Sequence, residues 1–153
     1  MSEWTEILEA IGLALAGERD AGQAQLRDCW ERTTDQQHAQ RCVLAHYLAD
    51  LESELEAEIA WDERAINEFS DVGEFDLVPI GISSAAAMAP SLHLNLGDGY
   101  LRASRIAEAR TQVVSGIASS GLLDDTGYGA LIRSGLDRLL AKVELAEDSS
   151  AGL

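Results

Sequence analysis

The sequence predicts an all-α fold. The chain of 153 residues contains only two prolines, and aromatic residues make up 5% of it. Alanine and leucine dominate long segments, which favours helix over strand on intrinsic propensity. Apolar residues recur every three to four positions through most of the chain, the spacing of an amphipathic helix. With 46% hydrophobic residues, the chain is long enough to form one domain with a core of its own, expected over 1–145.

A first helical hairpin is predicted over 2–33. Ser2 is the expected N-cap, and the apolar residues from Trp4 to Leu15 lie along one helical face. Gly17 ends this helix, and a second apolar pattern closes near Thr33. The two patterns are separated only by the short turn GERD, so they are expected to pack on each other.

A second hairpin is predicted over 35–68. Thr34 or Asp35 can cap its first helix, and the chain turns near 50–53 before a second helix from about Glu54 to Glu68. The next segment, 69–89, mixes glycine and proline with an alanine-rich run and is expected to form a loop or a short extra helix. Pro90 fits either the first turn of a helix or a kink in a longer one.

The third hairpin is predicted over 90–120 and is followed by a capping helix over 124–145. The capping helix has an aspartate cap, Asp124 or Asp125, and a regular apolar side. The remaining residues, 146–153, are short and polar and are expected to be a disordered tail.

The third hairpin resembles a tetratricopeptide repeat (TPR), whose pattern is W-x2-L-G-x2-Y, then A-x3-F, then P. Leu96 and Gly97 match the Leu-Gly pair, Tyr100 the tyrosine, Ala109 the small alanine and Val113 the large apolar position. The resemblance implies a right-handed superhelix of about three TPR-like hairpins with a C-terminal capping helix. A terminal helix is also expected on physical grounds, because stacked repeats leave an apolar face at each end.

The resemblance further implies a concave groove that holds a protein or peptide partner, as in an adaptor or regulatory protein without catalysis. The positions that would face this groove, carried over from the family, are Trp4, Ile7, Ile11, Cys42, His46, Asp50, Leu94, Asn95, Asp98 and Arg102.

The charge of the chain narrows the classes of partner. With 11 basic and 27 acidic residues, the formal net charge is −16, which disfavours nucleic acid and favours a basic protein or peptide. No apolar run is long enough to span a bilayer, so no membrane role is expected. Two cysteines and an N-terminus without a basic leader predict a cytoplasmic protein. The apolar faces at the two ends of the helical array could also support a homodimer.

One alternative function is metal binding. His38, Cys42 and His46 follow one another at four-residue spacing, and imidazole and thiolate are zinc and copper ligands. His38 and His46 would lie roughly 12 Å apart on a helix, too far for one ion. The candidate set is therefore Cys29, Cys42 and His46, although the two cysteines can equally be small core residues.

A second alternative is an enzyme, or an accessory subunit of one, with a closed pocket. Cys42 and His46 could form a nucleophile and base, but an acidic surrounding opposes a thiolate and no oxyanion device is visible. The sequence therefore predicts neither catalysis nor a cofactor.

Overall fold

The structure, a computed structural model, describes residues 3–151. Within this range it contains seven α-helices and no β-strand, which confirms the all-α prediction. The chain divides into two compact units, one ending at Ala85 and one beginning at Ala86, whereas a single domain was expected.

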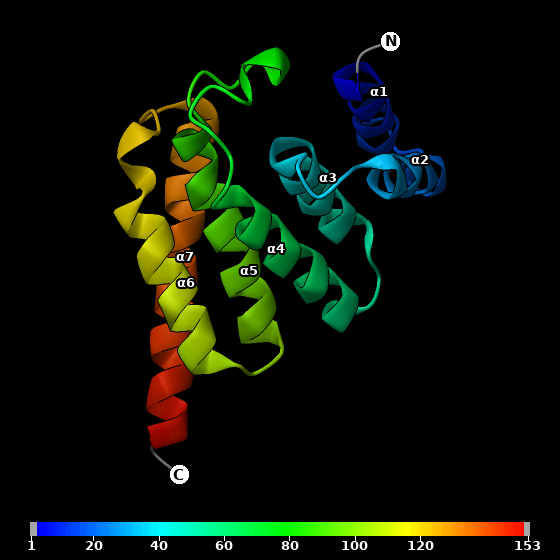
Figure 1. Cartoon of the computed structure of the whole chain (residues 1–153). Coiled ribbons are helices and arrows are strands. Elements are labelled where there is room, and N and C mark those ends of the chain that lie inside the picture. Colours follow the sequence, from blue (N-terminus) through cyan, green and yellow to red (C-terminus); the bar gives the residue numbers. More distant parts are fainter. Residues whose placement is uncertain (1–2, 152–153) are drawn as a thin grey trace. The chain divides into compact units, whose positions relative to one another are not determined.

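The first unit consists of two helical hairpins (Figure 1). The helices α1 (Glu3–Leu15) and α2 (Arg19–Arg32) form the first hairpin, and α3 (His38–Leu51) and α4 (Leu55–Phe69) form the second. Gly17 separates α1 from α2 with a φ of +92°, a backbone conformation that glycine adopts without steric cost. The predicted N-cap, Ser2, lies outside the described residues.

The two helices of the first hairpin approach closely at Gly22. A Cβ added at this glycine would lie 2.8 Å from the backbone nitrogen of Ala14 and 2.9 Å from its Cα. Because no side chain fits at that distance, Gly22 sets the separation of α1 and α2.

The core of this unit is built around α3. Its buried residues are Ala39, Cys42, Val43, Leu44, Ala45, Leu48 and Ala49. Ile7 from α1, Leu26 from α2 and Ile59 from α4 are also buried. At one edge Trp30 of α2 and Trp61 of α4 meet edge to face, with ring centroids 5.0 Å apart, so the second and fourth helices are in contact.

Helix α3 begins three residues later than predicted. The backbone nitrogen of Gln37 donates to the carbonyl of Thr34 at 3.1 Å, and the nitrogen of Thr34 donates to the Gln37 side chain at 2.7 Å. These two bonds close a turn over 34–37, which replaces the predicted first helical turn at Asp35.

The segment between α4 and α5 is a loop with two short 3-10 turns, η1 (Val78–Ile80) and η2 (Ala85–Met88). Within it, the backbone nitrogen of Ala85 donates a hydrogen bond to the carbonyl of Glu74 at 2.9 Å. Pro90 lies in the first turn of the helix that follows, where its missing N–H leaves no helical bond unmade.

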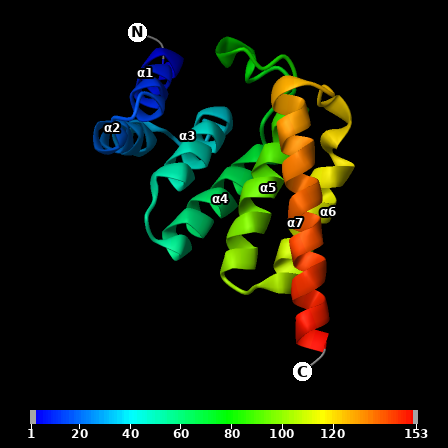
Figure 2. The same cartoon turned by 180° about the vertical axis from the view of Figure 1, so that it is seen from behind.

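The second unit packs three helices side by side, α5 (Ala89–Arg102), α6 (Ile106–Ala118) and α7 (Gly127–Ala151), as Figures 1 and 2 show. A short 3-10 turn, η3 (Ser120–Leu122), lies between α6 and α7. Ala109 and Val113 of α6 are fully buried, and a Cβ on Gly97 would lie 3.3 Å from the Cβ of Gln112. The small residues of the third predicted hairpin therefore lie where its two helices meet.

Helix α7 corrects the predicted tail. It begins at Gly127 and continues to Ala151, so residues 146–151 are helical where disorder was expected; 152–153 lie outside the described residues. The last turns are held against α6 by Arg110, whose Nε and Nη2 lie 2.6 and 2.8 Å from the two carboxylate oxygens of Glu147. This long-range pair supplies the order that the polar composition alone did not predict.

Candidate functional site

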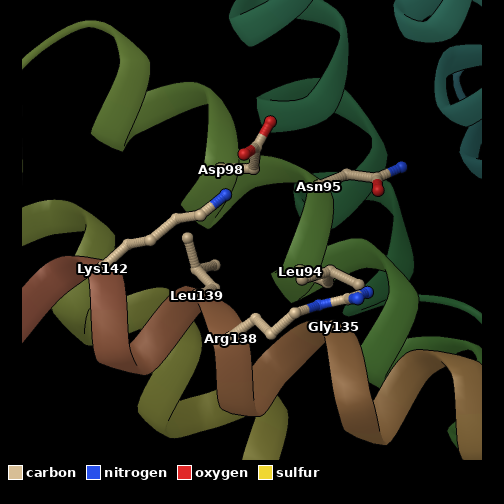
Figure 3. A pocket seen from close by; sticks show the side chains of 7 residues that line it. All are labelled: Leu94, Asn95, Asp98, Gly135, Arg138, Leu139 and Lys142. Atoms are coloured by element: carbon tan, nitrogen blue, oxygen red, sulfur yellow. The ribbon is translucent and has the colours of Figure 1, made fainter.

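A surface cleft lies between α5 and α7 in the second unit (Figure 3). It encloses about 390 Å³, within the usual range for small-ligand and peptide subsites. Its lining residues are Leu94, Asn95 and Asp98 from α5, and Gly135, Arg138, Leu139 and Lys142 from α7. All of these α7 residues lie within about two helical turns, so one face of each helix forms one wall.

The floor of the cleft is made by two leucines that each pack over a glycine of the opposite helix. A Cβ on Gly135 would lie 2.9 Å from Cδ2 of Leu94, and a Cβ on Gly97 would lie 2.9 Å from Cδ2 of Leu139. The two contacts are reciprocal: a leucine from α5 over α7, and a leucine from α7 over α5. This arrangement brings the helices close together and leaves an apolar strip between polar rims.

The rims carry charges of both signs. On α5, the Asp98 carboxylate accepts a hydrogen bond from Nε of Arg102 at 2.9 Å, so it is already paired. On α7, Arg138 and Lys142 are exposed and one helical turn apart. Figure 3 shows the Lys142 side chain extending from α7 toward Asp98.

Three predicted groove residues therefore line one cleft: Leu94, Asn95 and Asp98. Arg102, a fourth, lies one turn farther along α5 and is the ion-pair partner of Asp98. The prediction missed Arg138 and Lys142, because α7 was expected only to cover an apolar end. A signal was present, since Lys142 is the only lysine in the sequence and follows Arg138 at four-residue spacing.

In the first unit, three predicted groove residues are instead part of the core. Ile7, Ile11 and Cys42 are 2%, 7% and 0% exposed, so their side chains are not available to a partner. The apolar face of α1 that was assigned to the groove packs against the unit's own helices, because burying it there removes it from water. Trp4, on the same helix, is partly exposed.

His46 and Asp50 lie one turn apart on α3. The His46 ring meets Tyr47 edge to face at 5.3 Å, and Nη2 of Arg19 donates to the backbone carbonyl of Asp50 at 3.3 Å. Burial lowers the pKa of His46, and the nearby Asp50 partly opposes this shift. Burial also raises the pKa of Asp50. Both shifts are in the direction of the neutral forms.

The predicted metal ligands are not brought together. Among residues 3–151, no group of three or more His, Cys, Asp or Glu side chains has the arrangement of a metal site. Cys29 and Cys42 are both buried and unbonded to each other, and burial raises the pKa of Cys42 to about 12. A thiol that resists ionisation to this extent is a poor ligand and a poor nucleophile, as expected of a core residue.

His38, the remaining member of the row, makes a different contact. Its Nδ1 lies 2.6 Å from Oε2 of Glu68 at the end of α4. This hydrogen bond raises the pKa of His38 and ties the start of α3 to the end of α4. The residue therefore has a structural partner.

Comparisons of the chain with protein-family models, with curated proteins and with solved structures found no match. None of the helices described is both long and apolar enough to cross a bilayer.

Proposed function

We propose that this chain is a non-catalytic scaffold that binds a protein or peptide partner, as an adaptor or regulatory protein. In this proposal its three hairpins are TPR-like repeats of a right-handed superhelix and α7 is their cap. The close packing at Gly97 and the burial of Ala109 and Val113 support it, because these are the positions at which the repeat pattern requires small or apolar residues.

The observation that carries the proposal is the cleft between α5 and α7. It combines two leucines and a glycine with four polar or charged side chains, so a partner would find both apolar contact and hydrogen-bonding groups there. Leu94, Asn95 and Asp98 were assigned to a binding groove from the repeat pattern alone, and they line this cleft together.

Site-specific photo-crosslinking tests the proposal. A photoreactive amino acid replaces Asp98 at the cleft, or Thr111 on the exposed side of α6 as a control. In extract from the native cell, the Asp98 position is expected to yield one discrete crosslinked partner that the Thr111 position does not yield. A peptide array of the partner then identifies the bound segment.

Two outcomes would contradict the proposal. One is the same crosslinking pattern from both positions, and the other is the absence of any crosslinked product from the cleft. A crosslink between two copies of this chain, confirmed by sedimentation, would replace the adaptor role by self-association.

A further inference from the structure

Most of the basic side chains of this protein have an interaction partner within the structure. In the part of the chain that the structure describes, nine arginines each have a hydrogen bond, an ion pair or an aromatic ring as partner. They are Arg19, Arg27, Arg32, Arg41, Arg64, Arg102, Arg105, Arg110 and Arg133. Over the same residues, Arg138 and Lys142 have no such partner.

These two unpaired cations are neighbours. Residues four apart on a helix lie on one face and about 6 Å apart along its axis, so Arg138 and Lys142 form a pair on the α7 rim of the cleft. The one carboxylate of the cleft lining, Asp98, is already neutralised by Arg102 at 2.9 Å. The cleft therefore has a local positive charge in a chain whose net charge is −16.

We infer that the cleft between α5 and α7 binds a peptide segment in which aspartate or glutamate alternates with apolar residues. Its carboxylates would pair with Arg138 and Lys142, and its apolar side chains would lie on Leu94, which is partly exposed in the cleft. The inference rests on the proposed function and names the chemistry of its ligand. It also differs from the basic partner that the net charge favours.

The spacing of the groups supports an alternating sequence. In an extended peptide, residues two apart point to the same side and are separated by about 6.6 Å, close to the rise between Arg138 and Lys142. The residues between them point away from Arg138 and Lys142, toward the opposite wall of the cleft, where the partly exposed Leu94 of α5 lies. A guanidinium binds a carboxylate through two parallel hydrogen bonds, which favours carboxylates as partners of Arg138.

A binding measurement with three synthetic peptides tests this inference on the full chain. The probes are fluorescent hexapeptides of alternating glutamate and leucine, glutamine and leucine, and lysine and leucine, followed by fluorescence anisotropy. The glutamate peptide is expected to bind about tenfold more tightly than the glutamine peptide, because it adds charge-assisted hydrogen bonds. Raising the salt from about 0.05 to about 0.5 M is expected to weaken that preference.

Lys142 gives a direct readout, because it is the only lysine in the sequence. Reductive methylation with ¹³C-formaldehyde labels it together with the N-terminal amine, and its NMR signal is expected to shift on addition of the glutamate peptide. No shift at saturating peptide would overturn the inference.

Paired variants locate the effect. Arg138→Gln with Lys142→Gln is expected to reduce the affinity for the glutamate peptide about tenfold. The control pair, Arg19→Gln with Arg64→Gln, removes the same charge from the first unit. It is expected to change the affinity for the glutamate peptide by less than about twofold. Charge reversal, Arg138→Glu with Lys142→Glu, is expected to shift the preference to the lysine peptide. Among residues 3–151 neither Arg138 nor Lys142 has a partner, so these variants should fold, which circular dichroism verifies.

The failure of this inference can be separated from failure of the proposed function. Tighter binding of the glutamine or lysine peptide, together with a crosslink at Asp98, would overturn the inference of an acidic ligand. The proposed scaffold function would stand. Binding of no peptide and no crosslink would overturn both. Binding of no peptide, with a dimer that Arg138→Gln and Lys142→Gln dissociate, would assign the cleft to a second copy and also overturn the inference.

Discussion

Arg110 on α6 and Glu147 on α7 form a two-pronged ion pair, with Nε–Oε2 and Nη2–Oε1 separations of 2.6 and 2.8 Å. The pair joins positions 37 residues apart in the sequence and anchors the last two turns of α7. It also lowers the pKa of Glu147, through the hydrogen bond from Arg110.

Glu147→Gln is therefore expected to loosen the end of α7. Its amides over 146–151 should exchange with solvent faster, because the helix end loses its long-range contact. Hydrogen exchange measured by NMR checks this, with Asp148→Asn as the matched control, since Asp148 is exposed and has no ion pair in the described chain. Equal exchange rates over 146–151 in the two variants would show that the ion pair does not order the end of α7.

Two glycines of the first hairpin are expected to respond to alanine in opposite directions. At Gly22 a Cβ would meet the Ala14 backbone at 2.8 Å, so Gly22→Ala should destabilise the chain by about 1–3 kcal/mol through overpacking. At Gly12 a Cβ would meet nothing within 4 Å, so Gly12→Ala should stabilise α1 by about 0.5–1 kcal/mol. Urea unfolding measures both, and a stable Gly22→Ala would contradict the close approach of α1 and α2.

The His38–Glu68 pair makes the stability of the first unit depend on pH. The hydrogen bond to Glu68 raises the pKa of His38 above its ordinary 6.5, so the folded state binds the proton more tightly than the unfolded state. Its contribution is complete below pH 6.5 and is lost as the pH rises through the pKa of the folded state.

The difference in urea midpoint between the wild type and His38→Gln isolates this contribution from that of His46. The difference should shrink as the pH rises from about 6 to about 9. In NMR titrations Glu68→Gln should lower the pKa of His38, whereas His46 should keep a pKa below 6.5 because burial causes its shift. A pKa of His38 that is unchanged by Glu68→Gln would refute the assignment.

Both cysteines are expected to be unreactive in the folded protein. Cys42 is fully buried with a pKa raised to about 12, and burial also raises the pKa of Cys29. Ellman's reagent at pH 8 should therefore label neither thiol rapidly in the native state and both in urea. Fast labelling of Cys42 without denaturant would show that α3 is not the centre of the core.

The sequence predicted the positions of the helices better than their contacts. The segments around Trp4, Leu44 and Leu96 were each expected to be helical, and all three are. The errors fell at the ends. Helix α3 begins after Asp35, α7 begins at Gly127 and not at the expected cap Asp124 or Asp125, and α7 continues past 145. A turn over 34–37 and a distant ion pair decide the first and the last of these boundaries.

The candidate site was predicted in part for the same reason. Leu94, Asn95 and Asp98 share one face of α5, and helical periodicity places them together without knowledge of any other helix. Ile7, Ile11 and Cys42 also share faces with predicted groove residues, but periodicity cannot tell whether an apolar face meets a partner or the protein's own core.

By itself, the sequence determined that this protein is helical, where most of its helices lie and which residues are small enough for helices to meet. These properties depend on helix propensity and on hydrophobic periodicity, which are set by residues close together in the sequence. The tertiary structure alone decided that Arg138 and Lys142 stand across a cleft from Asp98. That neighbourhood depends on α7 packing against α5 through Gly97 and Gly135, a contact between segments about 40 residues apart that no local pattern encodes.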